Sequence, residues 1–317
     1  MNTRHSRSTL ISTAATVLAS VMSILAATAQ TPTPAPDPDA AHPAFQVKIS
    51  GEGRPMIMIP GLASSGATWD ATAAHLGSHF RCFQLTLAGF AGVSPVKGDL
   101  LADARDQIAG YIRENHLDHP VIMGHSLGGS IAMDLAARNP QLVGPVIIVD
   151  SLPFFAAAWF NAKDLAAAQP TINQMRTGMQ SMTAEQWQAM SRSGASTNSM
   201  ATSPKDQKTL IDWSLASDQK TVTDAMIGVV SEDLRPELKN IDTPVLVIGT
   251  WVGLKSYGVT EQSATDEFHQ QFAGVKHLQF VMAKEARHFV MWDDPAWFNT
   301  QVDNFLKTTT GATVAER

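Results

Sequence analysis

The sequence GHSLG at residues 124–128 constrains the fold of this chain more than any other stretch. It follows the apolar run Val121–Met123 and precedes a run with helical character, Ser130–Arg138. A serine at the tip of a sharp strand-to-helix turn has a strained backbone, so the residues two positions away must lack a β-carbon. Such a turn presents the Ser126 hydroxyl at a helix N-terminus, where free N–H groups stabilise developing negative charge. The alternative is a glycine-rich helix start capped by Ser126, but the flanking strand and helix favour the turn.

Strand-like runs alternate with helical runs along most of the chain. Strands are expected at residues 45–49, 56–59, 82–87, 121–123, 145–150, 244–249 and 277–282. Helices are expected at residues 68–76, 99–116, 130–138, 260–273 and 295–306. This alternation predicts an α/β fold, with a mostly parallel sheet covered by helices on both faces.

Residues 152–238 interrupt the alternation and read as an inserted helical cap on a core formed by residues 45–151 and 239–317. Buried strand runs disappear there, and the segment is rich in methionine and tryptophan. These residues are Met175, Met179, Met182, Trp187, Met190, Trp213 and Met226. Methionine-lined surfaces adapt to varied apolar ligands, which suits a lid over a binding site.

The first 29 residues have the features of a secretory signal peptide. Arg4 and Arg7 precede an apolar stretch over residues 10–25, and a small-residue site predicts cleavage after Ala29. An uncleaved N-terminal anchor is the alternative. Residues 30–44 form a proline-rich linker. We therefore expect a periplasmic or secreted protein, with no stable membrane insertion after cleavage.

Charge and cysteine content narrow the class of partner. Removing residues 1–29 changes the formal net charge from −6 to −8, which disfavours binding to nucleic acid and to anionic membranes. The single cysteine, Cys82, permits no internal disulfide. The sequence lacks zinc-ligand spacing, a phosphate-binding loop and a dinucleotide fingerprint, so we expect no metal and no organic cofactor.

A late histidine completes a recognisable pattern. His288 follows the last predicted strand and precedes an acidic residue and proline that begin a helix, Asp294-Pro295. With the GHSLG turn, this order resembles the α/β-hydrolase superfamily across the whole mature chain, with a helical cap between the sixth and seventh strands of that fold. The resemblance implies that Ser126 is a nucleophile and His288 its general base. We expect His125 to pack beside its strand.

The same resemblance implies an oxyanion hole formed by two backbone N–H groups, those of Leu62 and Leu127. The loop before Leu62 reads Pro-Gly-Leu, where the family carries His-Gly-x. A backbone N–H can donate without that histidine, so the difference from the family sequence leaves the expected oxyanion hole intact.

The catalytic acid is the open point. Relatives carry Asp a few residues after the seventh strand, but residues 249–255 of this chain contain no carboxylate. Some members place the acid after the preceding strand, and Asp150 occupies that position. A carboxylate there must reach the ring nitrogen of His288 that faces away from Ser126. Glu261, Asp266 and a Ser–His dyad remain alternatives.

These features predict an esterase that acts on a small-molecule substrate through an acyl-enzyme. Trp251 indicates an apolar pocket for an acyl or aromatic group, together with the aromatic residues that open the cap: Phe154, Phe155, Trp159 and Phe160. Alternative activities on the same fold are carbon–carbon bond hydrolysis, peroxyacid formation and aminopeptidase action. A non-catalytic ligand-binding protein is a further alternative, and the sequence does not indicate an oligomeric state.

Overall fold

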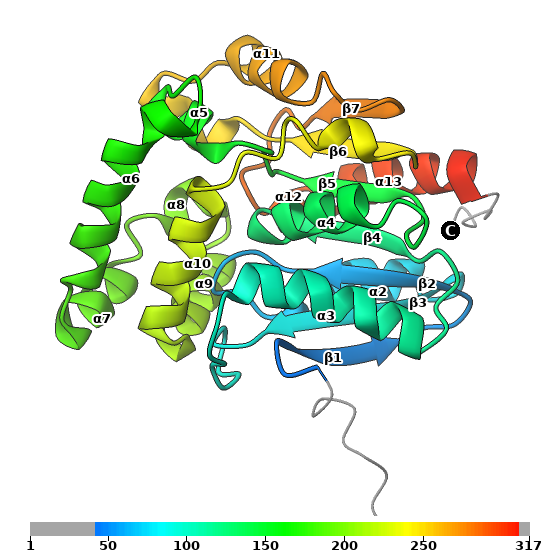
Figure 1. The fold of residues 1–317 in the computed structure, drawn as a ribbon, viewed down its shortest axis with the longest axis horizontal. Coiled ribbons are helices and arrows are strands. Elements are labelled where there is room, and N and C mark those ends of the chain that lie inside the picture. Colours follow the sequence, from blue (N-terminus) through cyan, green and yellow to red (C-terminus); the bar gives the residue numbers. More distant parts are fainter. Residues whose placement is uncertain (1–41, 311–317) are drawn as a thin grey trace, which may run out of the picture. The chain divides into compact units, whose positions relative to one another are not determined.

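The computed structural model describes residues 42–310, so the predicted signal peptide and nearly all of the predicted linker lie outside the described residues. A seven-stranded sheet forms the centre (Figure 1), in the order β1-β3-β2-β4-β5-β6-β7. Only β1 is antiparallel to its neighbour, and the other strands run parallel. The strands are β1 Phe45–Ser50, β2 Arg54–Ile59, β3 Phe80–Leu87, β4 Val121–His125, β5 Val146–Val149, β6 Val245–Gly249 and β7 Leu278–Met282.

The central strands are continuously apolar because both faces of the sheet are covered. In β2, Ile57 and Ile59 face one hydrophobic core, and Met56 and Met58 face the other. All four side chains are at most 1% exposed. This arrangement is expected of strands in a parallel sheet, and it confirms the predicted α/β class.

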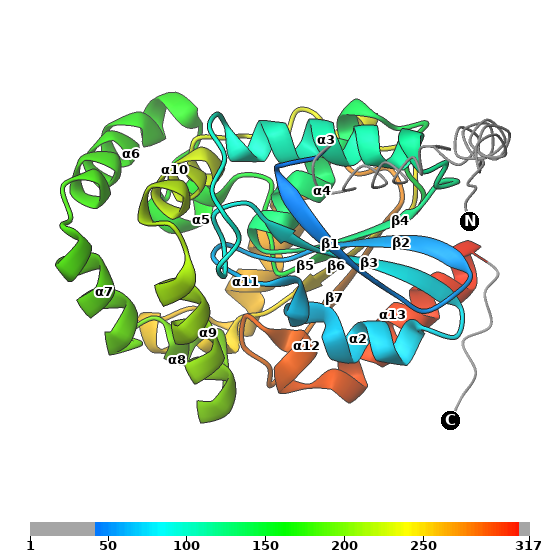
Figure 2. The same ribbon diagram turned by 90° about the horizontal axis from the view of Figure 1, so that it is seen from below.

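Helices form a layer on each face of the sheet (Figure 2). Helices α3 and α4 cover one face, and α2 and α13 cover the other. Phe268 and Phe272, at the end of α11, belong to the same core as α3 and α4. The core helices are α2 Asp70–Leu76, α3 Leu100–Glu114, α4 Leu127–Arg138, α11 Glu261–Gln271, α12 Val290–Asp293 and α13 Pro295–Thr310.

The segment between β5 and β6 is helical throughout its ordered elements. Its helices are α5 Phe155–Phe160, α6 Leu165–Gln180, α7 Ala184–Ser193, α8 Thr197–Met200, α9 Pro204–Ala216 and α10 Gln219–Val230. We call these six helices the cap. The family resemblance placed the cap between the sixth and seventh strands, but in the described sheet it lies between the fifth and sixth strands, β5 and β6. The described residues all belong to one compact unit, so the division into core and cap domains stays a prediction.

The described part of the chain contains no helix that could span a membrane. Across residues 42–310, every helix is either too short or too polar to cross a bilayer.

Candidate active site

Ser126 lies between β4 and α4 in a strained conformation, with φ 53° and ψ −122°. Its N–H donates to the carbonyl of Val149 on the neighbouring strand at 2.9 Å. A β-carbon on Gly124 would lie 2.2 Å from the carbonyl oxygen of Gly128, and one on Gly128 would lie 2.4 Å from the carbonyl oxygen of Ile59. The turn therefore requires glycine at both positions for a steric reason.

Asp150 and His288 meet beside this turn. His288 Nδ1 lies 2.6 Å from Asp150 Oδ2, and the two side chains are 25% and 13% exposed. Because a carboxylate only accepts, the shared proton belongs to Nδ1, and in a neutral imidazole this leaves Nε2 as an acceptor. Asp150 has a left-handed φ of 45°, a strain that clusters at functional sites.

Thr250 holds the Asp150 carboxylate in place. Its N–H donates to Oδ1 at 2.9 Å, and its hydroxyl donates to Oδ2 at 2.7 Å. No sequence pattern predicted this contribution, although Thr250 directly follows β6, the strand after which the acid was expected. Ser126, Asp150 and Thr250 follow three neighbouring parallel strands, whose carboxyl ends gather at one edge of the sheet.

The two other carboxylates considered from the sequence point elsewhere. Glu261 and Asp266 are both exposed on α11. Asp266 Oδ1 accepts from the side chain of Gln262 at 2.8 Å. The carboxylate on His288 is therefore that of Asp150.

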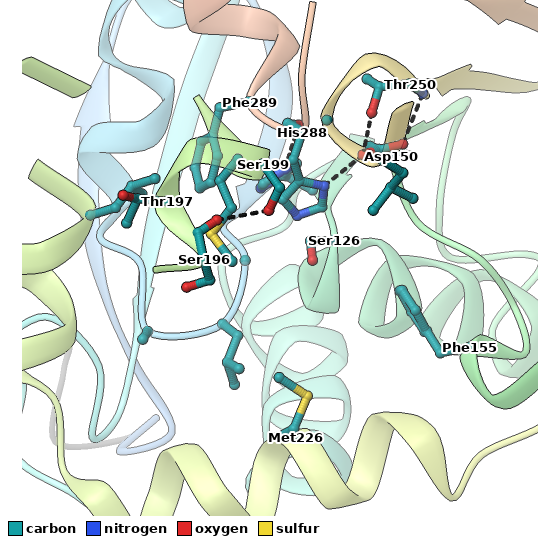
Figure 3. Close-up of a pocket in the computed structure, with 18 of the residues that line it drawn as sticks. Ser126, Asp150, Phe155, Ser196, Thr197, Ser199, Met226, Thr250, His288 and Phe289 are labelled. Atoms are coloured by element: carbon teal, nitrogen blue, oxygen red, sulfur yellow. Dashed lines mark hydrogen bonds and ion pairs between the residues drawn. The ribbon is translucent and has the colours of Figure 1, made fainter. Parts of the chain in front are cut away.

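Ser126 and His288 line the same cavity, which has a volume of about 570 Å³. Figure 3 shows the Ser126 hydroxyl near the His288 ring, with Asp150 at the ring's other nitrogen. Leu127 is the first residue of α4, so its N–H has no acceptor within the helix. The loop before Leu62 lies against the turn, since a β-carbon on Gly61 would lie 3.3 Å from Ser126 Cβ. Both candidate oxyanion donors thus flank Ser126.

His125 contacts the backbone of His288. It is fully buried, and its Nε2 donates to the backbone carbonyl of His288 at 3.0 Å. Burial holds the pKa of His125 well below its ordinary value, and the neighbouring His288 lowers this pKa further. A neutral His125 therefore acts as a structural contact that holds the His288 backbone, beside its strand as expected.

The cap encloses the cavity with mainly apolar side chains. Among the tryptophans and methionines noted in the sequence, the cavity is lined by Met179, Trp187, Met190 and Met226. Trp159, predicted as a pocket residue, also lines it and is 47% exposed.

Three pocket predictions require correction, because Phe154, Phe160 and Trp251 do not line this cavity. Phe154 is fully buried, and the guanidinium carbon of Arg235 lies 4.3 Å from its ring centroid. Its neighbour Phe155, predicted together with it, does line the cavity. Trp251 precedes a 3₁₀ helix, Val252–Tyr257, and the ammonium of Lys255 lies 5.8 Å from its ring centroid.

The loop that carries His288 is hydrogen-bonded to the cap. Phe289 N–H donates to the carbonyl of Met200, the last residue of α8, at 2.9 Å. The Asp293 carboxylate accepts from both the N–H and the hydroxyl of Thr202, and from Arg287 N–H. We call these contacts the cap latch. The sequence showed no signal for them, because the partners are about 90 residues apart.

In the described chain, no three His, Cys, Asp or Glu side chains gather in a way that could hold a metal ion.

Residues 56–301 match the family model described as the alpha/beta hydrolase family. The chain belongs to this family, and it is a hydrolase of that class. It is similar to the pimeloyl-[acyl-carrier protein] methyl ester esterase of Vibrio parahaemolyticus, with 27% identity over 81% of this chain and 96% of that protein. The protein of the same name from Aliivibrio fischeri is 30% identical over 62% of this chain and 75% of its own length.

Two other comparisons give weaker evidence about the activity of this chain. A relative from Yersinia enterocolitica is 34% identical, but this chain spans only 40% of its length. The enol-lactonase from Burkholderia xenovorans LB400 has a similar structure, with a TM-score of 0.66. That likeness covers 83% of this chain and 96% of the lactonase at 19% identity, and it shows the fold alone.

Proposed function

We propose that this protein is a serine hydrolase that cleaves carboxylic esters through an acyl-enzyme formed on Ser126. The observation that carries the proposal is the 2.6 Å contact between His288 Nδ1 and Asp150 Oδ2, in the cavity that Ser126 also lines. The names of the Vibrio and Aliivibrio relatives, which are methyl ester esterases, support an ester as the substrate.

In this proposal His288 Nε2 takes the proton from the Ser126 hydroxyl as the oxygen attacks the ester carbonyl carbon. The carbonyl oxygen becomes an oxyanion that accepts from the N–H groups of Leu62 and Leu127. His288 then passes its proton to the leaving alkoxide, and the alcohol departs. Water, deprotonated by His288, repeats the sequence and releases the acid. Asp150 stabilises the imidazolium and fixes its tautomer without taking the proton.

The apolar cap side chains support an apolar or aromatic acyl group as the part of the substrate that the cavity holds. Helices α5, α6 and α10 offer it only apolar side chains, among them Phe155, Met179 and Met226. Burial of such a group is favourable by roughly 25 cal/mol per Å² of apolar surface.

We also propose export to the periplasm or the medium, on the basis of residues 1–29. Mass spectrometry of the expressed protein tests this, and the expected mature N-terminus is Gln30. Recovery of the full-length chain in the cytoplasm contradicts export and leaves the catalytic proposal untouched.

Labelling with a fluorophosphonate probe tests the catalytic proposal. Wild-type protein is expected to be labelled, and Ser126→Ala is expected to abolish labelling. Asp150→Asn is expected to lower the labelling rate by roughly 10³–10⁴-fold, because the amide removes the charge that stabilises the imidazolium. Asp266→Asn is the matched control, since that carboxylate is exposed on α11, and its rate should stay within about twofold of wild type.

Two outcomes contradict the proposal. Absence of labelling in folded wild-type protein favours the non-catalytic ligand-binding alternative. An Asp150→Asn variant that is labelled at the wild-type rate removes Asp150 from the mechanism and leaves a dyad.

A further inference from the structure

The cavity around Ser126 is chemically divided. Helices α5, α6 and α10 contribute only apolar side chains, whereas every cap hydroxyl in the lining comes from residues 191–214. These hydroxyl residues are Ser191, Ser196, Thr197, Ser199 and Ser214. The core also brings polar side chains to the lining, among them Ser263 and Glu267, so the contrast lies within the cap. It indicates that different parts of the cap contact different parts of a substrate.

Ser199 is the hydroxyl residue of this group that lies beside the reacting centre. Figure 3 shows it next to His288, and the bond from Phe289 N–H to the carbonyl of Met200 joins the two segments. Gly253 fixes the position of Ser199 from another direction, because a β-carbon on Gly253 would lie 2.0 Å from the Ser199 carbonyl oxygen. The backbone at Ser199 and Met200 is therefore held by contacts from two directions.

The hydrogen bond that Ser199 already makes determines what it can offer a ligand. Its hydroxyl donates to the carbonyl of Ser196 at 2.7 Å. The single hydroxyl proton is thus committed, and the oxygen keeps lone pairs that can only accept. A ligand group that binds Ser199 must supply the proton, so it is a hydroxyl, an amine or an amide N–H.

The proposed reaction identifies which part of an ester lies beside Ser199. His288 Nε2 must pass its proton to the leaving oxygen, so the alcohol half of the substrate lies next to the His288 ring. Helix α10, which brings Val222 and Met226 to the cavity, packs instead against α4, the helix that follows Ser126. The acyl half therefore fits the apolar side, and the alcohol half fits the side of Ser199.

We propose that Ser199 forms a leaving-group subsite that selects esters whose alcohol carries a hydrogen-bond donor, such as a polyol, over esters of plain alkyl alcohols. This inference rests on the proposed function, because it assigns the two halves of an ester by the route of the His288 proton.

The test compares two esters with the same acyl group and the same carbon skeleton in the alcohol: 2,3-dihydroxypropyl butyrate and propyl butyrate. Acid release is followed at constant pH. The readout is the kcat/KM for the dihydroxypropyl ester divided by the kcat/KM for the propyl ester. Wild-type enzyme is expected to favour the dihydroxypropyl ester. Ser199→Ala is expected to lower the ratio by about fivefold, the effect of losing one hydrogen bond. Ser199→Thr keeps a hydroxyl and is expected to keep the preference.

Ser193→Ala is the matched control. The Ser193 hydroxyl donates to the carbonyl three residues earlier, that of Met190, as Ser199 does to Ser196, but Ser193 is exposed and does not line the cavity. Its ratio should equal that of wild type.

The possible results separate the two proposals. A wild-type ratio of one or less overturns the proposed subsite. A Ser199→Ala variant that hydrolyses both esters more slowly by the same factor also overturns it, because Ser199 would then only support His288. Absence of both hydrolysis and Ser126-dependent fluorophosphonate labelling overturns the proposed function, and this inference with it. Labelling with a ratio of one overturns the subsite alone.

Discussion

Replacing Asp293 with alanine tests whether the cap latch holds the His288 loop. The change removes three hydrogen bonds: from Thr202 N–H at 2.8 Å, from the Thr202 hydroxyl at 2.9 Å and from Arg287 N–H at 2.9 Å. Two of them join the loop to the cap, and the third lies one residue before His288. We expect both the stability of the fold and the turnover of substrate to fall.

The magnitude follows from the environment of the bonds. Hydrogen bonds to a charged acceptor contribute about 1.5–3 kcal/mol when well buried, but Asp293 is only partly buried and Thr202 is exposed. We therefore take about 1 kcal/mol for each bond, and 2–3 kcal/mol for Asp293→Ala in the free energy of unfolding. Displacement of His288 should lower kcat by about tenfold with a smaller change in KM, because misplaced catalytic groups slow the chemical step.

Urea unfolding and steady-state kinetics on one ester measure both effects. A double-mutant cycle with Thr202→Val isolates the hydroxyl bond, for which we expect a coupling free energy of about 1 kcal/mol. Asp212→Ala is the control, since its carboxylate binds only the exposed Lys208 on α9 and should change stability by less than about 0.5 kcal/mol. If Asp293→Ala is as stable and as active as Asp212→Ala, the latch does not hold the loop.

Two further predictions concern stability. Gly124→Ala places a β-carbon 2.2 Å from the Gly128 carbonyl oxygen and should destabilise the protein by more than about 3 kcal/mol. Gly178→Ala is the control, because Gly178 lies in α6 with open space around it, and the change should be neutral or stabilising. Equal melting temperatures for the two variants contradict the steric explanation of the turn. Burial, together with the Asp134 carboxylate, raises the pKa of Glu232 from 4.5 to about 7. Because the folded state then binds the proton more tightly, this group's contribution to stability is present below pH 4.5 and is lost as pH rises through 7, by at most about 3 kcal/mol. Glu232→Gln should flatten the pH dependence of urea unfolding in that window, and an unchanged slope argues against a raised pKa for the partly buried Glu232.

The sequence predicted the sheet and the turn at Ser126 well, because both depend on local patterns. Continuously apolar runs mark strands covered on both faces, and paired glycines mark the strained turn. Helix ends shifted by a few residues: the predicted helix at 68–76 begins as a 3₁₀ turn at Gly66–Trp69, and α2 follows from Asp70. Ser65 explains that start, since its side chain accepts from Ala67 N–H.

The pocket residues were harder to predict, because composition indicates an apolar surface without giving the direction of each side chain. Phe154 and Phe155 are adjacent in sequence, yet only Phe155 faces the cavity. Phe154 precedes α5 with non-helical angles, φ −142° and ψ 88°, and Phe155 begins the helix, so the two rings leave the chain in different directions. The side-chain hydroxyls of the cap had no sequence signal either, since serine is common on exposed helices.

The position of the acid depends on strand pairing, which no local pattern reveals. Strands β5 and β6 are neighbours, with Val149 opposite Ile248, so Asp150 after β5 lies one strand, roughly 4.8 Å, from the place after β6 where the family resemblance led us to expect the acid. A carboxylate can cover that distance if its backbone turns toward the histidine, and the left-handed φ of Asp150 makes that turn. Thr250, at the vacated place, donates two hydrogen bonds to Asp150 and so offsets the cost of burying its charge. What the proposed chemistry requires is therefore a supported carboxylate within reach of His288 Nδ1, and either of two adjacent strands can supply it.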